Sequence, residues 1–207
     1  SHKSRLVEIL AQSTSLRVQE VEEGLRPENK VIYITPPNAD VYFEDGRLHL
    51  MEPHLKIGPK PSVDYFFRSL ADNFGASAIG IILSGTGSDG AHGIRAIKAA
   101  GGFTISQRAS TAKYDGMPKS AKHTGAVDLE LSPEEIAKEL SRFGKISGRM
   151  KSEKASATNE DHFERIFATL ERDKGACFTN YKPSTVRRRV ERRIIATRCS
   201  SLEEYAN

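Results

Sequence analysis

Tryptophan is absent from the 207 residues, and only 2 cysteines are present. Cys177 and Cys199 have no second Cys or His at ligand spacing, so the sequence supports neither a disulfide framework nor a metal site. No apolar run reaches the roughly 18 residues that a membrane-spanning helix requires, and the N-terminus lacks the apolar core of a signal peptide. We therefore expect a cytoplasmic protein without membrane insertion.

Neither sign of charge predominates in the chain as a whole, since the net charge is only +4, but the positive charges are unevenly distributed. Arginines crowd the last part of the chain: Arg187, Arg188, Arg189, Arg192, Arg193 and Arg198. Such a cluster indicates a local acidic partner, although a solvated charged face is the simpler interpretation. The interleaved aromatics that nucleic-acid surfaces use are missing here, so we expect no nucleic-acid partner.

Helical and strand-like patterns alternate along the first part of the chain, which predicts an α/β fold with an open, doubly wound, mostly parallel sheet and a β-hairpin. Asp45-Gly46 between alternating apolar residues predicts the hairpin turn. The expected elements are helix 3–12, strands 15–21 and 31–34, the hairpin at Asp45-Gly46, a helix from Ser62 to Phe74, strand 78–83, helix 91–100, strand 103–106, a short helix near Pro118, strand 126–129 and a helix starting at Ser132.

The apolar pattern stops after the last of these helices, which predicts three segments. Residues 1–143 form the α/β domain, and residues 144–160 are small and charged, as in a flexible linker. Residues 161–207 carry helically spaced apolar residues and predict a small all-α segment, too short to bury much core alone.

The stretch Gly85-Thr-Gly-Ser-Asp-Gly90 matches the spacing of a dinucleotide-binding loop between a strand and a helix. Asp89, however, stands where a phosphate would bind, and two such charges about 4 Å apart repel by on the order of 4 kcal/mol at an effective dielectric near 20. Asp89 therefore argues against a nucleotide. Two roles are open for Asp89, and both can apply together: it caps the helix that begins at Ala91, and it orients a catalytic His at the carboxyl end of a central strand.

Together with the stretches Ala100-Gly-Gly-Phe-Thr-Ile-Ser-Gln107 and Tyr114-Asp-Gly-Met-Pro-Lys-Ser-Ala121, this loop resembles the catalytic domain of chemotaxis protein-glutamate methylesterases (CheB type). The resemblance covers about residues 1–142. It implies a Ser-His-Asp hydrolase without a cofactor, in which Asp89 is the triad acid. Thr86 and Gly87 would lie near the oxyanion site, and Gly116 and Met117 on its rim.

The nucleophile turn and the catalytic His of that family are not found in these residues, and His2 lies too far downstream to match the His. The resemblance therefore implies a methylesterase domain that lacks its first part, and we expect no activity from this chain alone. A non-enzymatic interaction or scaffold module on a degenerate hydrolase fold is the alternative.

The C-terminal segment contains Phe163-Glu-Arg-Ile-Phe167 and Tyr181-Lys-Pro-Ser-Thr-Val-Arg-Arg-Arg-Val-Glu-Arg-Arg193, and it resembles the start of the N-terminal helical domain of chemotaxis receptor methyltransferases (CheR type). This resemblance implies a fused signalling protein that acts on a methyl-accepting chemoreceptor or a similar glutamate-rich protein. Arg189, Arg192 and Arg193 would dock the receptor, and S-adenosylmethionine would bind mostly beyond Asn207.

Overall fold

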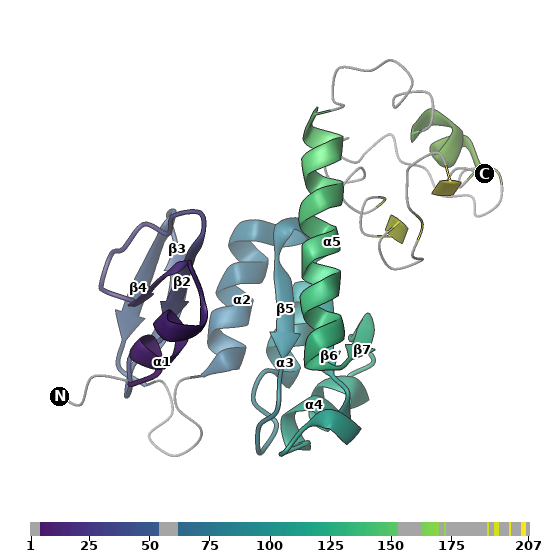
Figure 1. The fold of residues 1–207 in the computed structure, drawn as a ribbon. Helices are drawn as coiled ribbons and strands as arrows, with labels where there is room; N and C mark the ends of the chain where they lie inside the picture. The colour runs from purple at the N-terminus through teal and green to yellow at the C-terminus, as the bar shows by residue number, and fades with distance from the viewer. Residues whose placement is uncertain are drawn as a thin grey trace.

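The computed structural model describes residues 5–53, 62–152 and 163–169, together with single residues in the C-terminal segment (Arg172, Val190, Arg193, Ile194, Cys199, Glu204 and Tyr205). Its elements follow the expected order closely (Figure 1). They are α1 (Arg5–Ser13), β1 (Arg17–Glu20), β2 (Val31–Ile34), β3 (Asp40–Glu44), β4 (Arg47–Met51), α2 (Val63–Phe74), β5 (Ile79–Ile82), α3 (Ala91–Ala99), β6 (Phe103–Gln107), α4 (Gly116–His123), β7 (Leu129–Leu131) and α5 (Pro133–Ser152). Short 3₁₀ helices occupy Gly75–Ser77 and Ala109–Thr111.

The parallel strands form two sheets rather than the single sheet that the sequence predicts. In the described part of the chain, β1 pairs only with β2, whereas β5, β6 and β7 form a separate sheet in that order. No described strand bridges the two, so β5 is an edge strand here.

Helices cover both faces of the sheet β5–β6–β7, which is the doubly wound arrangement that the sequence predicts. Because side chains alternate along a strand, Ile82 lies on one face and packs with Ile94 and Ile97 of α3. Ile105 lies on the other face and packs with Ile136 of α5. Ile82, Ile94, Ile97 and Ile105 are at most 1% exposed, so each face carries a closed apolar core.

The hairpin turns at Asp45-Gly46 as predicted. Both residues have positive φ angles, 48° and 78°, which the turn requires. β3 and β4 then pair antiparallel, and one face of the hairpin buries Val41, Phe43 and Leu48. This face packs against Phe66 and Leu70 of α2, so the hairpin is held to the helix that precedes β5.

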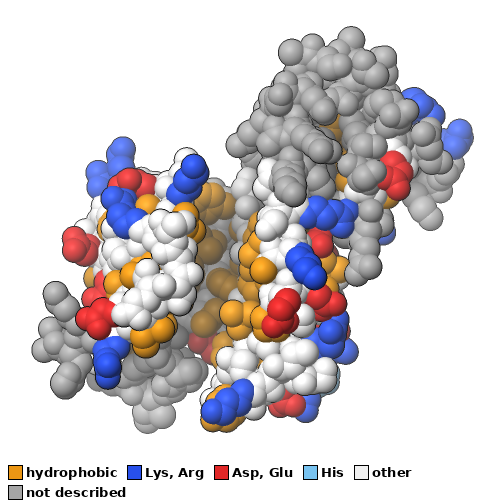
Figure 2. Space-filling view, viewed as in Figure 1, with side chains coloured by type: hydrophobic (Ala, Val, Ile, Leu, Met, Phe, Trp, Pro, Cys, Tyr) orange, Lys and Arg blue, Asp and Glu red, His pale blue; other side chains and the backbone are white. Residues whose placement is uncertain are grey.

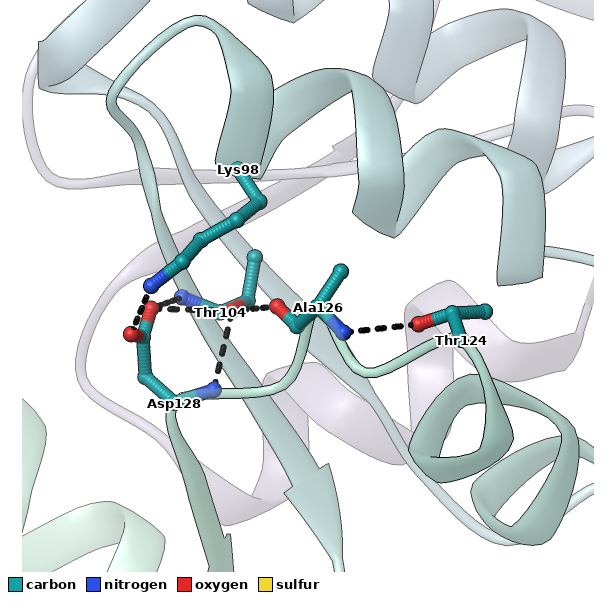
Figure 3. A network of polar contacts seen from close by, with 5 residues as sticks. All are labelled: Lys98, Thr104, Thr124, Ala126 and Asp128. Carbon is teal, nitrogen blue, oxygen red and sulfur yellow. Dashed lines mark hydrogen bonds and ion pairs between the residues drawn. The ribbon is translucent and has the colours of Figure 1, made fainter.

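The last strand begins later than the sequence predicts, because Thr104 holds the segment before it (Figure 3). The Thr104 hydroxyl donates to Ala126 O at 2.6 Å and contacts Asp128 Oδ2 at 2.9 Å, and the Thr104 N–H donates to the same carboxylate oxygen. Lys98 pairs with the other oxygen of Asp128. Regular parallel pairing starts only at Ile105↔Leu129, so β7 is 129–131 and not 126–129.

The segment predicted as a flexible linker is partly helical. Helix α5 continues through Ser152, whereas the sequence predicts a linker from Gly144 onward. Lys145, Arg149 and Lys151 are good helix formers, so the small and charged composition that predicts a linker does not prevent a helix here. The domain boundary stays a prediction.

The described residues of the C-terminal segment form a small apolar cluster of their own. Phe163, Ile166, Val190 and Ile194 are buried together. Figure 1 shows the helical piece 163–169 at the same end of the molecule as the C-terminal end of α5, away from the end to which β5 points. Arg142 of α5 donates to Cys199 O at 2.9 Å, which connects the two parts. Among the described helices, none has both the length and the apolar character to cross a membrane.

Candidate functional site

The loop that follows β5 lies at the carboxyl end of an edge strand of a parallel sheet, where α/β proteins place binding and catalytic groups. It turns through Gly87 and Gly90, whose φ angles are +85° and +89°. A side chain at Gly90 would collide with Ile82 and lie 3.1 Å from Val63 Cγ1. Glycine is therefore required there for two reasons, and the loop can return directly into α3.

Asp89 is fixed by three backbone N–H groups. Its Oδ2 accepts from Val63 N at 2.8 Å, and its Oδ1 accepts from Asp64 N at 3.0 Å and from Gly90 N at 2.9 Å. Val63 and Asp64 begin α2, so the carboxylate caps α2. The prediction that it caps the helix starting at Ala91 was wrong, because α3 has Gly90 at its N-cap without a side-chain cap.

Two more aspartates, Asp40 and Asp64, accept hydrogen bonds from backbone amides at or near the start of α2. Ser62 is its N-cap as predicted, with the hydroxyl accepting from Tyr65 N at 3.3 Å. The buried Asp40 accepts from Ser62 N at 2.7 Å. Asp64 reaches across to α3 and accepts from Gly93 N at 2.6 Å. The unsatisfied amides and the positive dipole end of α2 favour these negative groups.

The first half of the loop is clamped to the segment before α4. Gly85 N donates to Tyr114 O and Met117 N donates to Gly85 O, both at 2.9 Å. A Cβ on Gly116 would lie 2.9 Å from Gly87 N, so only glycine allows this approach. The structure therefore brings Gly87, Gly116 and Met117 close together, and their places near an oxyanion site and on its rim stay predictions.

Thr86 lies at the exposed tip of this clamp. Among the described residues its hydroxyl makes no hydrogen bond, so it is accessible from solvent. Its role beside an oxyanion site stays a prediction.

Gln107 is a structural support of the site that the sequence reading missed. It is 5% exposed at the carboxyl end of β6. Its Oε1 accepts from Ser84 N at 2.8 Å, and its Nε2 donates to Thr111 O at 2.9 Å. A Gln at the carboxyl end of a strand whose other residues are apolar or small hydroxyl residues is the signal that could have revealed it.

All the hydrogen-bond partners of Asp89 in the described chain are backbone N–H groups, and no His or Ser side chain contacts it there. His92 lies on the exposed side of the first turn of α3. The carboxylate has about four acceptor positions, two on each oxygen, and Oδ2 uses one of its two. One position on Oδ2 thus stays available for a donor from another segment. Within the described chain, no cluster of three or more His, Cys, Asp or Glu could hold a metal ion.

A phosphate has little to bind at this loop. In the first turn of α3, Ala91 N donates to Ser88 O and Gly93 N donates to Asp64. Gly90 N donates to Asp89. Three of the amides that a dinucleotide loop would present, those of Gly90, Ala91 and Gly93, are thus already engaged, in agreement with the electrostatic argument against a nucleotide.

Of the arginines predicted to dock a receptor, only Arg193 falls in the described part of the chain, and it is exposed. Arg189 and Arg192 lie outside the described residues. The three-residue strip therefore stays a prediction.

Comparison with known proteins divides the chain in two. Residues 1–140 match the family model for the CheB methylesterase, and residues 161–207 match that for the all-alpha domain of the CheR methyltransferase. The crystal structure of the Thermotoga maritima CheB methylesterase catalytic domain is similar with a TM-score of 0.61 and 27% identity, covering 67% of this chain and 75% of that one.

Two relatives show how the chain compares with longer proteins. A protein-glutamate methylesterase/protein-glutamine glutaminase 2 of Methanosarcina acetivorans is 34% identical over 142 residues, which cover 65% of this chain and 40% of the relative. An uncharacterized 104.1 kDa protein of Rhodobacter capsulatus is 32% identical over 229 residues, covering 97% of this chain and 23% of the relative. The chain therefore spans less than half the length of these relatives.

Proposed function

The chain belongs to the CheB methylesterase family through residues 1–140, and we propose that it is part of a signalling protein that hydrolyses glutamate methyl esters on chemoreceptors. The nucleophilic Ser and the His are supplied from outside these 207 residues. Asp89 supplies the third member of the triad. The observation that carries this proposal is the Asp89 carboxylate, fixed at the end of a parallel strand with one acceptor position on Oδ2 still available.

In the proposed reaction the Ser oxygen attacks the ester carbonyl while the His takes the hydroxyl proton. The His then donates that proton to the leaving methoxide, which departs as methanol. Water, deprotonated by the same His, hydrolyses the acyl-enzyme and frees the glutamate carboxylate and the Ser. Throughout both steps Asp89 accepts the Nδ1–H of the His, which fixes its tautomer and stabilises the imidazolium.

The backbone amides around Asp89 hold its carboxylate in the orientation needed to accept the hydrogen bond from the His. Two of its three N–H donors lie in the first turn of α2 and the third is Gly90, the N-cap of α3, so the carboxylate cannot rotate without breaking at least one of these bonds. Preorganised groups of this kind need no rearrangement in the transition state. The loop 85–87, clamped to Gly116 and Met117, would lie beside the developing oxyanion.

The test is methanol release from a methylated receptor peptide by the full-length gene product. We expect Asp89→Ala to lower kcat by about 10⁴, as loss of the acid does in a related triad enzyme, and to leave receptor binding unchanged. Asp72→Ala, at an exposed position of the same helix that Asp89 caps, is the matched control. Methanol release at the wild-type rate by Asp89→Ala would exclude Asp89 as the triad acid.

The second candidate is a non-enzymatic scaffold, favoured by the absence of any His or Ser side chain against Asp89 in the described chain. The same assay separates the two candidates. A full-length protein that binds the receptor and releases no methanol, with or without Asp89, supports the scaffold.

The C-terminal segment extends the proposal. A match of residues 161–207 to the methyltransferase domain supports a fusion in which S-adenosylmethionine serves the methyltransferase part. The described residues of this segment bury apolar side chains together, and the cofactor would bind mostly beyond this chain. Arg189, Arg192 and Arg193 would meet a glutamate-rich receptor surface, and the protein would act in the cytoplasm.

A further inference from the structure

Helices α2 and α3 cap each other at their N-terminal ends. The Asp89 carboxylate, which directly precedes α3, binds the amides of Val63 and Asp64 at the start of α2. In the opposite direction, the carboxylate of Asp64 binds the amide of Gly93 in the first turn of α3 at 2.6 Å. Each helix thus satisfies amides of the other that would have no partner within their own helix.

This reciprocal capping ties the direction of Asp89 to the position of α3. The backbone of Asp89 moves with α3, since Gly90 is the N-cap of that helix, whereas its carboxylate is held by α2. Any slip of α3 against α2 would turn the carboxylate. We infer that Asp64 is a positioning residue for the triad acid, an inference that rests on the proposed function of Asp89.

Helices α2 and α3 lie in close contact at the hydrogen bond between Asp64 and Gly93. A Cβ on Gly93 would lie 2.5 Å from Phe67 Cβ and 3.2 Å from Asp64 Cα, so only glycine lets the first turn of α3 lie against α2 here. Gly93 is buried, so removal of the Asp64 carboxylate would leave a buried N–H without its acceptor. Apolar packing is not directional, whereas a hydrogen bond is, so Asp64 fixes the register that packing alone leaves free.

Loss of this bond should therefore affect the chemical step and not substrate binding. A displacement of about 1 Å in a catalytic group can cost up to about 10²-fold in rate. We expect Asp64→Ala to lower kcat about ten- to a hundredfold, with KM unchanged, because Asp64 Oδ1 faces α3 and not the loop surface.

The experiment compares kcat and KM of the full-length protein with a methylated receptor peptide. Asp64→Asn is the rescue variant, because the Asn carbonyl oxygen can still accept the Gly93 N–H, and we expect it to keep a kcat close to wild type. Asp72→Ala controls for loss of a carboxylate from α2. Should Asp64→Ala fail to fold, Asp64→Ser is used instead. The Ser side chain is too short to reach the Gly93 N–H, so we expect the same loss of kcat.

The outcomes separate this inference from the proposed function. If Asp89→Ala loses activity while Asp64→Ala and Asp64→Ser retain wild-type kcat, the positioning role is wrong and the triad stands. An Asp64→Asn variant as impaired as Asp64→Ala would also overturn the positioning role, because the charge and not the hydrogen bond would then matter. If Asp89→Ala is fully active, the proposed function fails whatever Asp64 does.

Discussion

Carboxylates at helix N-termini recur in this protein, and Glu135 at the start of α5 is one whose pKa is shifted in a clear direction. It forms a capping box at the start of α5, where Glu135 Oε2 accepts from Ser132 N at 2.7 Å and Ser132 Oγ accepts from Glu135 N at 3.3 Å. The Ser132 N–H, together with the guanidinium of Arg108 at 2.8 Å, lowers the pKa of Glu135 below its ordinary value. The ionised form is thus the one that holds the cap.

The resulting prediction concerns stability against pH. Because the folded pKa of Glu135 is lowered, its contribution is present above the unfolded pKa of about 4.3 and is lost as pH falls through the folded value. We expect Glu135→Gln to lower the Tm at pH 7 and the difference from wild type to shrink as the pH falls below about 4.3. Thermal denaturation between pH 7 and pH 3 measures this.

Glu22→Gln provides the matched control for that series, since Glu22 is an exposed glutamate whose side chain has no hydrogen-bond or ion-pair partner within the described chain. It should leave the Tm unchanged throughout. A difference for Glu135→Gln that stays constant down to pH 3 would contradict the lowered pKa.

At the scale of the elements, the start of β7 is decided by hydrogen bonds of Thr104 and not by the strand-like sequence that precedes it. Ala126 to Leu129 carry a strand-like sequence, yet the fully buried Thr104 captures Ala126 O and Asp128 before the ladder begins. This contact lies at the amino ends of the strands, opposite the Asp89 loop. Asp128 is therefore a structural residue, whereas Asp89 lies at the edge where chemistry is expected.

Replacing the hydroxyl of Thr104 tests that contact. Thr104→Val keeps the shape and leaves the Ala126 carbonyl without its donor, which should cost about 1–3 kcal/mol of unfolding free energy. Urea denaturation measures the loss. Thr104→Ser, which retains the hydroxyl and loses only a methyl group, is the control, and a Val variant more stable than the Ser variant would refute the argument.

Local sequence patterns predicted those elements well whose backbone conformation depends on one or a few neighbouring residues. The hairpin at Asp45-Gly46, the cap at Ser62 and the strand β5 are confirmed because positive φ angles, capping hydroxyls and continuous apolar residues are local signals. The predicted central place of β5 was wrong for the described chain, where β5 is an edge strand, because the order of strands in a sheet is not a local property. The contacts of Asp89 with α2 could not be predicted, since they join residues 25 and 26 positions apart. Asp64 and Gln107 were missed for the same reason, because their partners lie on other elements.

For the molecule as a whole, the division into two parallel sheets leaves apolar surface without cover. Figure 2 shows hydrophobic side chains gathered in the hollow between the part that contains β1–β4 and the part that contains α5. Large apolar residues elsewhere are also exposed, among them Leu6 at 45%, Ile9 at 57% and Leu83 at 51%. Contiguous exposed apolar surface usually marks a site of association.

We therefore expect the 207-residue chain, prepared by itself, to bind an apolar fluorescent dye. The double variant Leu6→Ser/Ile9→Ser should reduce the dye signal, because both residues lie on α1 and neither is in a buried core. Ile94→Val, a change inside the core of α3, is the control and should leave it unaltered. If wild type and the double variant give the same dye signal, α1 does not contribute to the exposed apolar surface that binds the dye.

The reciprocal capping of α2 and α3 has one further consequence, for the ionic surroundings in which the protein works. A helix end with free amides exchanges buffer anions, and its local field then varies with phosphate or sulfate concentration. Here the counter-anions are carboxylates of the chain itself, hydrogen-bonded to the helix amides, so they do not exchange with anions of the buffer. The field at the site is accordingly set by the sequence and not by the solution.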